Sequence, residues 1–338
     1  MNREALLREH PGLFLLDPAD LAGLRLYLGG RGLVEGEEVL AAAKAGEGNM
    51  NCTVRVTTTR RRIIVKQARP WVEKYDHIAA PWDRSHVEAA FYRVVSAGGG
   101  PSSAMPQLLG ADPVARVLIL EDLGEQGDCT TIYGGAPLTG HESARLAEYL
   151  RRLHACPVPA RERALLANRD MRALNHEHIF LFPLREANGL ALDAITPGLS
   201  ALAEAARKDR AYVDRIHALG ARYLADGDHL VHGDYFPGSW LRALRGIAII
   251  DPEFCFTGAP EFDVGVMLAH LLLAAQPDAL VTHHLGSFAG GYDGALVRGF
   301  AGAEIMRRLI GVAQLPLPAS RERKHALLAK SRELVMGA

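Results

Sequence analysis

The chain has 338 residues, of which 49% are hydrophobic and 23% are charged, and its formal net charge is -1. This length and composition are typical of a globular protein with two lobes or domains, and the near-neutral charge gives no global field that would attract nucleic acid or an anionic membrane. We therefore expect a small neutral or locally neutralised substrate, and neither a nucleic-acid partner nor a membrane partner.

The cysteines and the apolar segments indicate a cytoplasmic protein. The 4 cysteines are scattered, without a CxxC pair or a zinc-finger spacing, as is typical of reduced thiols. The first residues, MNREALLREH, carry charges where a signal peptide needs an apolar core. The longest apolar stretch, Val264 to Ala275, contains a histidine and is too short to span a bilayer.

The N-terminal third changes from a helical pattern to a strand pattern. Asp17, Pro18 and Asp20 predict a helix start, because they supply a cap, a proline in the first turn and an acid near the positive end of the dipole. This helix extends to about Leu28. Three segments rich in Val, Ile and Thr follow, at residues 39–45, 52–59 and 62–68. They predict a three-stranded antiparallel meander.

The first turn of this meander, GEGNMN, contains Gly46, Gly48, Asn49 and Asn51. A backbone with so few large side chains could lie over phosphate groups, although ordinary hairpin turns use the same residues and are the more common case. Lys66 closes the third strand. A lysine in this place is usually an edge or surface residue, yet one strand after a glycine turn it could reach the same phosphates.

Glu88 has two interpretations. It follows Ser85 at the spacing of a capping box, which the local sequence by itself favours. Alternatively, its carboxylate pairs with Lys66 and orients it.

A bilobal α+β fold follows from the remaining pattern. The apolar strand at residues 116–123 ends in a natural crossing point to a second lobe. Helical spacing dominates afterwards, at residues 141–156, 207–225, 262–275, 285–288, 295–312 and from about 319. We expect a small N-terminal antiparallel β-sheet lobe at residues 1–123 and a larger, mainly helical lobe at residues 124–338, with a cleft between them.

The stretch from His229 to Glu253 carries most of the candidate chemistry. It places His232, Gly233 and Asp234 in a loop, and a short apolar strand at residues 247–250 then ends in Asp251 and Glu253. Two carboxylates at a strand end could converge on a metal ion. Taken singly, Asp234 is as well explained as a structural residue of a glycine turn, and Asp251 as an ordinary Asp-Pro turn.

In combination these motifs resemble the protein-kinase-like superfamily in its aminoglycoside phosphotransferase branch. HGDxxxxS at residues 232–239 stands where kinases have HRDxxxxN, and DPE at residues 251–253 stands where they have DFG. More narrowly, the chain is similar to the S-methyl-5-thioribose kinase family in GEGNMN, IVKQARP, MRALNHEHIF, IDPEFCFTGAPEFDVG and FAGAEIMRRLIG. The likeness extends from about Ala45 to Val312. A protein-kinase-like fold is the corresponding expectation.

The resemblance implies an enzyme that transfers phosphate from ATP to the anomeric hydroxyl of 5-methylthioribose. The glycine turn would lie over the phosphates, and Lys66, oriented by Glu88, would hold the α- and β-phosphates. The adenine would lie on main-chain groups from Glu121 to Leu123. Asp251 and Glu253, assisted by Ser239, would bind one or two Mg²⁺ ions.

The resemblance also implies a sugar site. Asp234 would orient the sugar hydroxyl and accept its proton. Composition would leave Arg307 and Arg308 solvated, whereas the family's paired arginines approach the sugar hydroxyls. Trp82 would help to close the site. Relatives suggest a homodimer, although the sequence contains no dimer motif.

Neighbouring residues receive structural interpretations. We expect His232 to be buried and to hold the loop by hydrogen bonds, and Asp263 to be an acid that steadies the same loop. His283 and His284 are placed on a helix surface, without a third ligand that would make a metal site.

Three residues depart from the family's pattern. Tyr235, Phe236 and Pro237 precede Gly238 where the family reads Leu-His-Thr, so the substrate pocket is the part in question. A kinase for another small sugar or alcohol, such as a 5-deoxypentose or an aminoglycoside-like acceptor, remains an alternative. A nucleotide-binding pseudokinase is another. The number of metal ions, the oligomeric state and lobe motion stay open.

Overall fold

The computed structural model describes residues 3–34, 36–46, 50–315 and 317–337. The chain divides into two compact units, Met1–Glu125 and Gln126–Ala338. The division falls two residues beyond the lobe boundary expected after residue 123.

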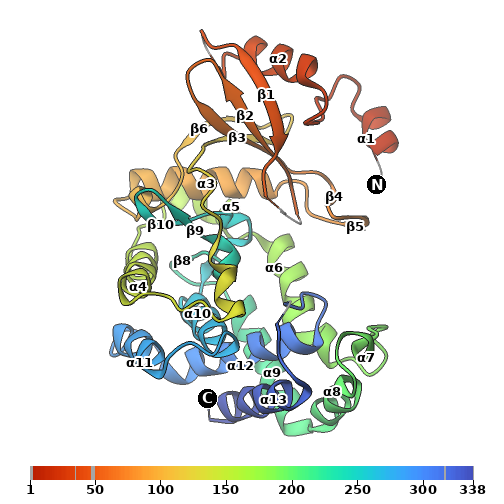
Figure 1. The fold of residues 1–338 in the computed structure, drawn as a ribbon, viewed down its shortest axis with the longest axis vertical. Coiled ribbons are helices and arrows are strands. Elements are labelled where there is room, and N and C mark those ends of the chain that lie inside the picture. Colours follow the sequence, from red (N-terminus) through yellow and green to blue (C-terminus); the bar gives the residue numbers. More distant parts are fainter. Residues whose placement is uncertain (1–2, 35, 47–49, 316, 338) are drawn as a thin grey trace. The chain divides into compact units, whose positions relative to one another are not determined.

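The N-terminal unit, coloured red to yellow in Figure 1, is built on a five-stranded antiparallel sheet. The strand order is β1-β2-β3-β7-β6, and β4 and β5 form a separate ladder. The elements are α1 (Arg3–Glu9), α2 (Leu21–Gly30), β1 (Val39–Lys44), β2 (Cys52–Thr58), β3 (Arg62–Gln67), β4 (Trp71–Val72), β5 (Tyr75–Ala79), α3 (Arg84–Ala97), η1 (Ser102–Ala104), β6 (Leu108–Asp112) and β7 (Val117–Glu121). The expected meander is confirmed as β1 to β3.

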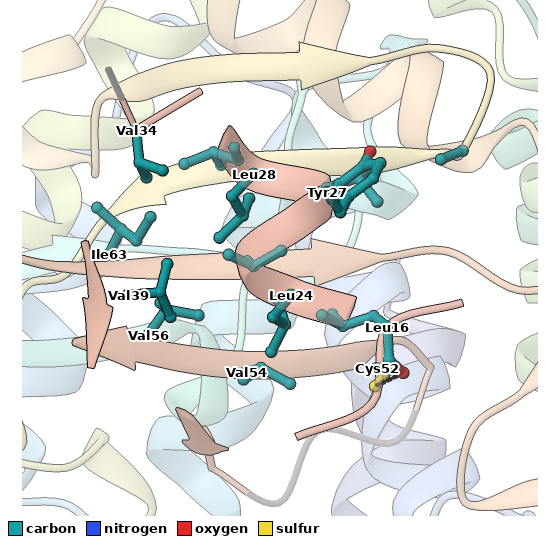
Figure 2. Close-up of a cluster of buried hydrophobic side chains, with 14 residues drawn as sticks. Leu16, Leu24, Tyr27, Leu28, Val34, Val39, Cys52, Val54, Val56 and Ile63 are labelled. Carbon is teal, nitrogen blue, oxygen red and sulfur yellow. Dashed lines mark hydrogen bonds between the residues drawn. The ribbon is translucent and has the colours of Figure 1, made fainter. Parts of the chain in front are cut away.

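Helix α2 covers one face of this sheet. Figure 2 shows Leu24 and Leu28 of α2 among the strand residues Val54, Val56 and Ile63, which belong to one buried apolar cluster. Burying this apolar area stabilises the unit by about 25 cal/mol per Å² removed from water. The helix nevertheless begins later than expected.

The cap of α2 is Asp20, not Asp17. The Asp20 carboxylate accepts a hydrogen bond from the main-chain N–H of Gly23 at 2.8 Å, so the first turn starts at Leu21. Asp17 instead accepts from Ala19 N–H at 2.9 Å, in a turn that precedes the helix.

The opposite face of the sheet carries Lys66. Side chains alternate along β3, so Ile63 and Val65 belong to the cluster under α2, while Ile64 and Lys66 point to the other face. Helix α3 packs near β6 and β7. The period of two therefore brings Lys66 to α3.

The C-terminal unit is mainly helical (Figure 1). Its elements up to the second ladder are η2 (Cys129–Gly134), α4 (Gly140–His154), α5 (Ala160–Leu166), α6 (Arg169–His176), η3 (Glu177–Leu181), η4 (Phe182–Leu184), α7 (Leu192–Ile195), α8 (Leu199–Lys208), α9 (Arg210–Leu224), β8 (His229–Val231), η5 (Pro237–Ser239), β9 (Trp240–Ala243) and β10 (Gly246–Ile249). They are followed by η6 (Pro252–Phe254), β11 (Phe256–Gly258), α10 (Glu261–Leu273), α11 (Asp278–Ser287), α12 (Gly294–Ile310) and α13 (Arg321–Met336). Each unit thus matches the expected α+β division into a sheet and a helical part.

Helices α10 and α12 form the centre of this unit. Gly265 of α10 allows the close approach, because a Cβ atom there would lie 2.7 Å from the carbonyl oxygen of Val297 in α12. These two helices carry Asp263, His270, Glu304 and the adjacent arginines described below.

The expected surface position of both histidines of α11 is wrong for one of them. His284 is fully buried and its Nε2 lies 3.0 Å from the carbonyl oxygen of Val264, whereas His283 is exposed. Successive residues of a helix differ in direction by about 100°, so only one of the pair can face α10. No helix in the described part of the chain has both the length and the apolarity that a bilayer crossing requires.

Candidate active site

A buried ion pair joins the sheet of the N-terminal unit to α3. The Nζ atom of Lys66 lies 2.9 Å from Oε1 of Glu88, and their side chains are 5% and 2% exposed. The capping-box interpretation of Glu88 is wrong, because α3 has Asp83 at its N-cap and no side-chain capping bond. The carboxylate is directed at Lys66 instead.

The glycine turn between β1 and β2 is tied to the start of α3. Gly46 adopts a left-handed conformation with φ +67°, while Gly48 and Asn49 lie outside the described residues. The Oδ1 atom of Asn51 accepts a hydrogen bond from Nε of Arg84 at 3.0 Å, and the same guanidinium donates to the carbonyl oxygen of Met50 at 2.8 Å. Arg84 therefore fixes the end of the turn that leads into β2, at Met50 and Asn51.

The main-chain N–H groups at the end of β7 differ in whether they donate a hydrogen bond. The N–H of Glu121 donates to the carbonyl oxygen of Gln107 at 2.9 Å. The N–H of Leu123 forms no hydrogen bond with any residue that the structure describes. Leu123 thus presents the donor that a planar ligand such as adenine would use, and its role there stays a prediction.

Trp82 has a structural role in the N-terminal unit. Its indole N–H donates to the carbonyl oxygen of Ala68 at 3.0 Å, and the Arg116 guanidinium lies 4.8 Å from its ring centre. Whether it also closes a sugar site stays a prediction.

In the C-terminal unit, strand pairing brings two loops together. Strand β8 pairs antiparallel with β11, with Val231 opposite Phe256, so the loop after β8 and the loop before β11 leave the ladder at the same end. The hairpin of β9 and β10 likewise brings Ser239 close to Asp251. The N–H of Ile250, the residue before Asp251, donates to the carbonyl oxygen of Ser239 at 3.0 Å. The sequence pattern predicted β10 but missed β9.

Asp263 fixes the loop that contains Asp234. Its Oδ2 accepts the N–H of His232 at 2.7 Å and its Oδ1 accepts the N–H of Gly233 at 2.9 Å, and the carboxylate is fully buried. The Nε2 atom of His232 lies 3.1 Å from the carbonyl oxygen of Ile250. The expected structural roles of His232 and Asp263 are therefore confirmed.

Gly233 allows the two loops to touch. It has φ +83°, and a Cβ atom there would overlap the carbonyl oxygen of Phe254. Asp251, which precedes this turn, itself adopts a left-handed conformation with φ 59°. Such a conformation in a non-glycine residue is held by its surroundings and is frequent at functional sites.

Ser239 and Glu253 lie in the same loop pair. The Ser239 hydroxyl donates to the carbonyl oxygen of Asp234 at 2.9 Å, so its proton is used within the loop and only its oxygen lone pairs remain for a metal. Glu253 is buried, and its negative charge contributes to raising the pKa of Asp234.

Arg307 and Arg308 are not solvated, contrary to what composition suggests. Both are 7% exposed in their side chains, and the Nη2 atom of each lies 3.6 Å from Oδ1 of Asp234. Each also donates its Nε–H to Glu304. Two positive groups therefore flank the candidate proton acceptor.

The environment of Asp234 suits a proton acceptor. Burial raises the pKa of its carboxyl from 3.8 to about 6, and the positive charges of Arg308 and Arg307 oppose that rise. Its side chain is still 25% exposed, so a ligand can reach it. A pKa near the operating pH favours general-base chemistry.

The aromatic residues after Asp234 point in two directions. Tyr235 is fully buried, donates its hydroxyl to the carbonyl oxygen of Leu146 at 3.0 Å and stacks on Tyr149. Phe236 instead places its ring 4.7 Å from the Arg308 guanidinium carbon. Of these two, Phe236 is the one that contacts the arginine pair.

Sequence reasoning missed the residues behind the arginines. Glu304 precedes Arg307 and Arg308 by three and four positions, a spacing that places side chains on one helix face and that could have been noticed. His270 and Tyr133 lie far from Glu304 in the sequence and carried no such signal. They are joined to it by hydrogen bonds.

The acid residues present fit a magnesium ion. No group of three or more His, Cys, Asp or Glu side chains converges as metal ligands among the described residues. Mg²⁺ is usually held by one or two carboxylates, with water and substrate phosphates completing its shell. Asp251 and Glu253 supply that number of carboxylates on one short turn.

The fold and site define a phosphotransferase of the protein-kinase-like class. Residues 42–296 match the model of the phosphotransferase enzyme family. The chain therefore belongs to this family, and the resemblance drawn from its motifs is confirmed.

Curated relatives add a narrower likeness. The chain is 30% identical to a methylthioribose kinase of Exiguobacterium sibiricum, over 72% of this chain and 64% of that one. It is 28% identical to that of Erwinia tasmaniensis, over 69% and 60%. It is 26% identical to that of a Geobacillus species, over 88% and 85%. The chain thus spans less than two thirds of the length of the first two relatives.

Solved structures support the fold. A spectinomycin phosphotransferase in complex with ADP and spectinomycin has a TM-score of 0.56 at 13% identity, covering 93% of this chain and 97% of that one. An ADP-bound aminoglycoside phosphotransferase has a TM-score of 0.51 at 14% identity, covering 95% and 98%. The expected protein-kinase-like fold is confirmed.

Proposed function

We propose that this protein is an ATP-dependent kinase of a small neutral sugar, and that 5-methylthioribose, phosphorylated at its anomeric hydroxyl, is the substrate. The observation that carries the proposal is the approach of two buried arginines to Asp234, with each Nη2 atom 3.6 Å from Oδ1. The names of the curated relatives support the particular sugar.

In the N-terminal unit, Lys66 binds the α- and β-phosphates of ATP and Glu88 holds the lysine in place. The adenine is placed on the main chain from Glu121 to Leu123, where the Leu123 N–H is a donor. Gly46 and Asn51, at the two ends of the glycine turn, lie near the phosphates. Positioning of this kind supplies much of the rate in phosphoryl transfer, because little covalent chemistry is asked of the protein.

In the C-terminal unit, Asp234 orients the acceptor hydroxyl and takes its proton. The sugar oxygen forms a bond to the γ-phosphorus, the bond from that phosphorus to the bridging oxygen breaks, and ADP leaves. Asp251 and Glu253, with the Ser239 oxygen beside them, would hold Mg²⁺. When bound, this ion offsets the negative charge of the phosphates.

Charge favours a neutral sugar over an aminoglycoside. An aminoglycoside would bring ammonium groups toward the guanidinium groups of Arg307 and Arg308, and like charges at close range disfavour a ligand. Sugar hydroxyls, in contrast, accept hydrogen bonds from the arginine N–H groups without repulsion. Another neutral pentose remains the second candidate, because Phe236 contacts Arg308 at the position where the chain departs from the family.

The test is ADP release with ATP, Mg²⁺ and a panel containing 5-methylthioribose, a 5-deoxypentose, ribose and an aminoglycoside. The proposal expects the highest kcat/KM with 5-methylthioribose. Equal values for all pentoses would remove that sugar as the substrate, and a preference for the aminoglycoside would remove the neutral-sugar class. ATP binding without ADP release from any acceptor would identify a pseudokinase.

Variants of the arginines locate the sugar. Arg307→Ala and Arg308→Ala should each raise the KM of the sugar more than the KM of ATP, because the arginines contact the acceptor side of the site. Equal effects on both constants would assign the arginines a structural role.

A further inference from the structure

Two adjacent helical residues should not point at the same atom. Arg307 and Arg308 follow each other on α12, where successive side chains leave the axis about 100° apart. Their Nη2 atoms nevertheless both lie 3.6 Å from Oδ1 of Asp234. Something besides the helix must turn the two guanidinium groups toward each other.

Glu304 is placed to do this. It lies one turn earlier on α12, and its two oxygens divide between the arginines. Oε2 accepts the Nε–H of Arg307, and Oε1 accepts the Nε–H of Arg308 at 2.7 Å. With both Nε–H groups engaged on Glu304, each guanidinium turns its terminal nitrogen to Asp234.

Glu304 is itself held in place by a chain of hydrogen bonds through His270 and Tyr133. The Nε2 atom of His270 lies 3.0 Å from Oε1 of Glu304, and the Nδ1 atom of His270 lies 2.6 Å from the hydroxyl of Tyr133. Because an ionised carboxylate only accepts, Nε2 carries the proton and Nδ1 accepts from Tyr133. All three side chains are buried. The acceptor-only carboxylate of Glu304 sets the direction of the whole chain of hydrogen bonds.

The protonation states agree with this direction. The arginine charges and the hydrogen bond from His270 hold the pKa of Glu304 well below its usual range despite its burial. Burial lowers the pKa of His270 to about 4, so its ring is neutral at physiological pH. The positive charges of Arg307 and Arg308 are therefore balanced by the negative charges of Glu304 and Asp234. The net charge of these four side chains is zero when both acids are ionised.

We propose that Glu304, backed by His270 and Tyr133, is a positioning residue that makes Arg307 and Arg308 a paired donor for an acceptor with a hydroxyl next to the reacting one. This inference rests on the proposed function, in which the acceptor carries a hydroxyl beside the reacting one, and adds the residues that position the two arginines toward it. Nη1 of Arg308 donates to the carbonyl oxygen of Ala313 at 3.3 Å, so Nη2 is the Arg308 nitrogen directed at Asp234. Asp234 takes the reacting hydroxyl, and the Nη2 groups of the two arginines beside it donate to the neighbouring hydroxyl.

The kinetic test compares an acceptor sugar with its 2-deoxy analogue. In the wild-type protein the analogue should lose about 10- to 100-fold in kcat/KM, as expected for a lost hydrogen bond to a charged group. Glu304→Gln should raise the KM of the full sugar by a similar factor, leave the KM of ATP within about threefold, and abolish most of the discrimination against the analogue. Retention of full discrimination in Glu304→Gln would overturn the proposal.

A second variant covers the case in which Glu304→Gln does not fold. Glu304→Asp keeps the charge but shortens the side chain by one methylene, so it should reduce the discrimination while keeping the buried charges balanced. Full discrimination in Glu304→Asp would overturn the proposal. The matched control is Glu142→Gln, since Glu142 also accepts an arginine Nε–H, from Arg242 at 2.9 Å, but is paired away from Arg307 and Arg308. Glu142→Gln should discriminate against the 2-deoxy analogue as strongly as the wild-type protein does.

An NMR measurement separates this inference from the proposed function. The Nε–H signals of Arg307 and Arg308, assigned by their loss in Arg307→Lys and Arg308→Lys, should lie downfield in the wild type because both are bonded to a carboxylate. In Glu304→Gln at least one should move upfield, whatever the substrate is. If no sugar is phosphorylated, the proposed function fails, while unchanged signals would overturn the role of Glu304.

Discussion

In the N-terminal unit, Nζ of Lys66 lies 2.9 Å from Oε1 of Glu88, with both side chains at most 5% exposed. Removing either partner of a buried ion pair destabilises the protein, because the remaining charge is unpaired where water cannot reach it. The pair is therefore a sensitive point both for stability and for the proposed binding of phosphates.

Variants of Lys66 and Glu88 test the two roles of the pair. Lys66→Met should lower turnover by about two to three orders of magnitude and raise the KM of ATP, because a donor to the phosphates is lost. Glu88→Gln should lower the free energy of unfolding by about 3–5 kcal/mol, measured by urea denaturation. The control is Lys330→Met, which breaks an exposed pair with Glu333 and should change stability by less than about 0.5 kcal/mol. Normal ATP kinetics in Lys66→Met would exclude a phosphate role.

Asp234→Asn should abolish most of the turnover without abolishing nucleotide binding. The amide cannot accept the sugar proton, so kcat should fall by about two to four orders of magnitude. ATP affinity, measured by calorimetry, should stay within about threefold, because the side chain is assigned to the acceptor. Near-normal turnover would remove Asp234 from the mechanism.

Acid pH should inactivate the protein by protonating Asp234. Its pKa is raised to about 6 in the ligand-free protein, and the carboxylate form is the one that can accept a proton. The kcat/KM for the sugar should therefore fall as pH decreases through this region. Bound Mg²⁺ would move the fall to lower pH, because a cation favours the carboxylate.

The pKa itself can be measured without metal. The carboxyl ¹³C resonance that disappears in Asp234→Asn should titrate near pH 6 in the free protein. A midpoint below about pH 4, the ordinary value for aspartate, would contradict the effect of burial.

Asp251 and Glu253 should control the magnesium requirement. Asp251→Asn and Glu253→Gln should each raise the Mg²⁺ concentration for half-maximal turnover by about tenfold or more, because a neutral amide is a weaker ligand than a carboxylate. Asp228→Asn is a suitable control, since Asp228 is an exposed acid paired with Arg163. An unchanged Mg²⁺ requirement in both test variants would mean that the metal is held elsewhere.

Arg84 should couple the glycine turn to α3. Its guanidinium is 1% exposed and bonds to Asn51, to Met50 and to the carbonyl oxygens of Arg69 and Pro81. Arg84→Ala should lower the free energy of unfolding by about 2–4 kcal/mol and raise the KM of ATP, because these acceptors lose their donor. Arg93→Ala, at an exposed position of the same helix, should change neither by much.

Much of the fold could be predicted because its signals are local. The alternation in β1 to β3 and the helical spacing of α4, α9, α10 and α12 needed no knowledge of distant residues. The start of α2 could not be predicted from local sequence, since Asp17 and Asp20 are both good caps and the structure has Asp20 in that position. The short strand β9 was missed because Arg242 interrupts its apolar residues, whereas β10, of the same length, is continuously apolar after Gly246.

By itself, the sequence determined which chemistry is present. The order of a glycine turn, Lys66, Asp234 and the acid pair Asp251 and Glu253 gave the class of phosphotransferase, because motif spacing is carried along the chain.

Only the tertiary structure decided which partner each side chain has. It joined Glu88 to Lys66 instead of to a helix cap, turned His284 inward, and brought Arg307 and Arg308 to Asp234. The physical reason is that a polar side chain pairs with whatever group packing brings within hydrogen-bonding or ion-pairing distance, and that packing depends on elements far apart in the sequence. Glu304, His270 and Tyr133 show this most clearly, since they form one hydrogen-bonded chain from three separate helical segments.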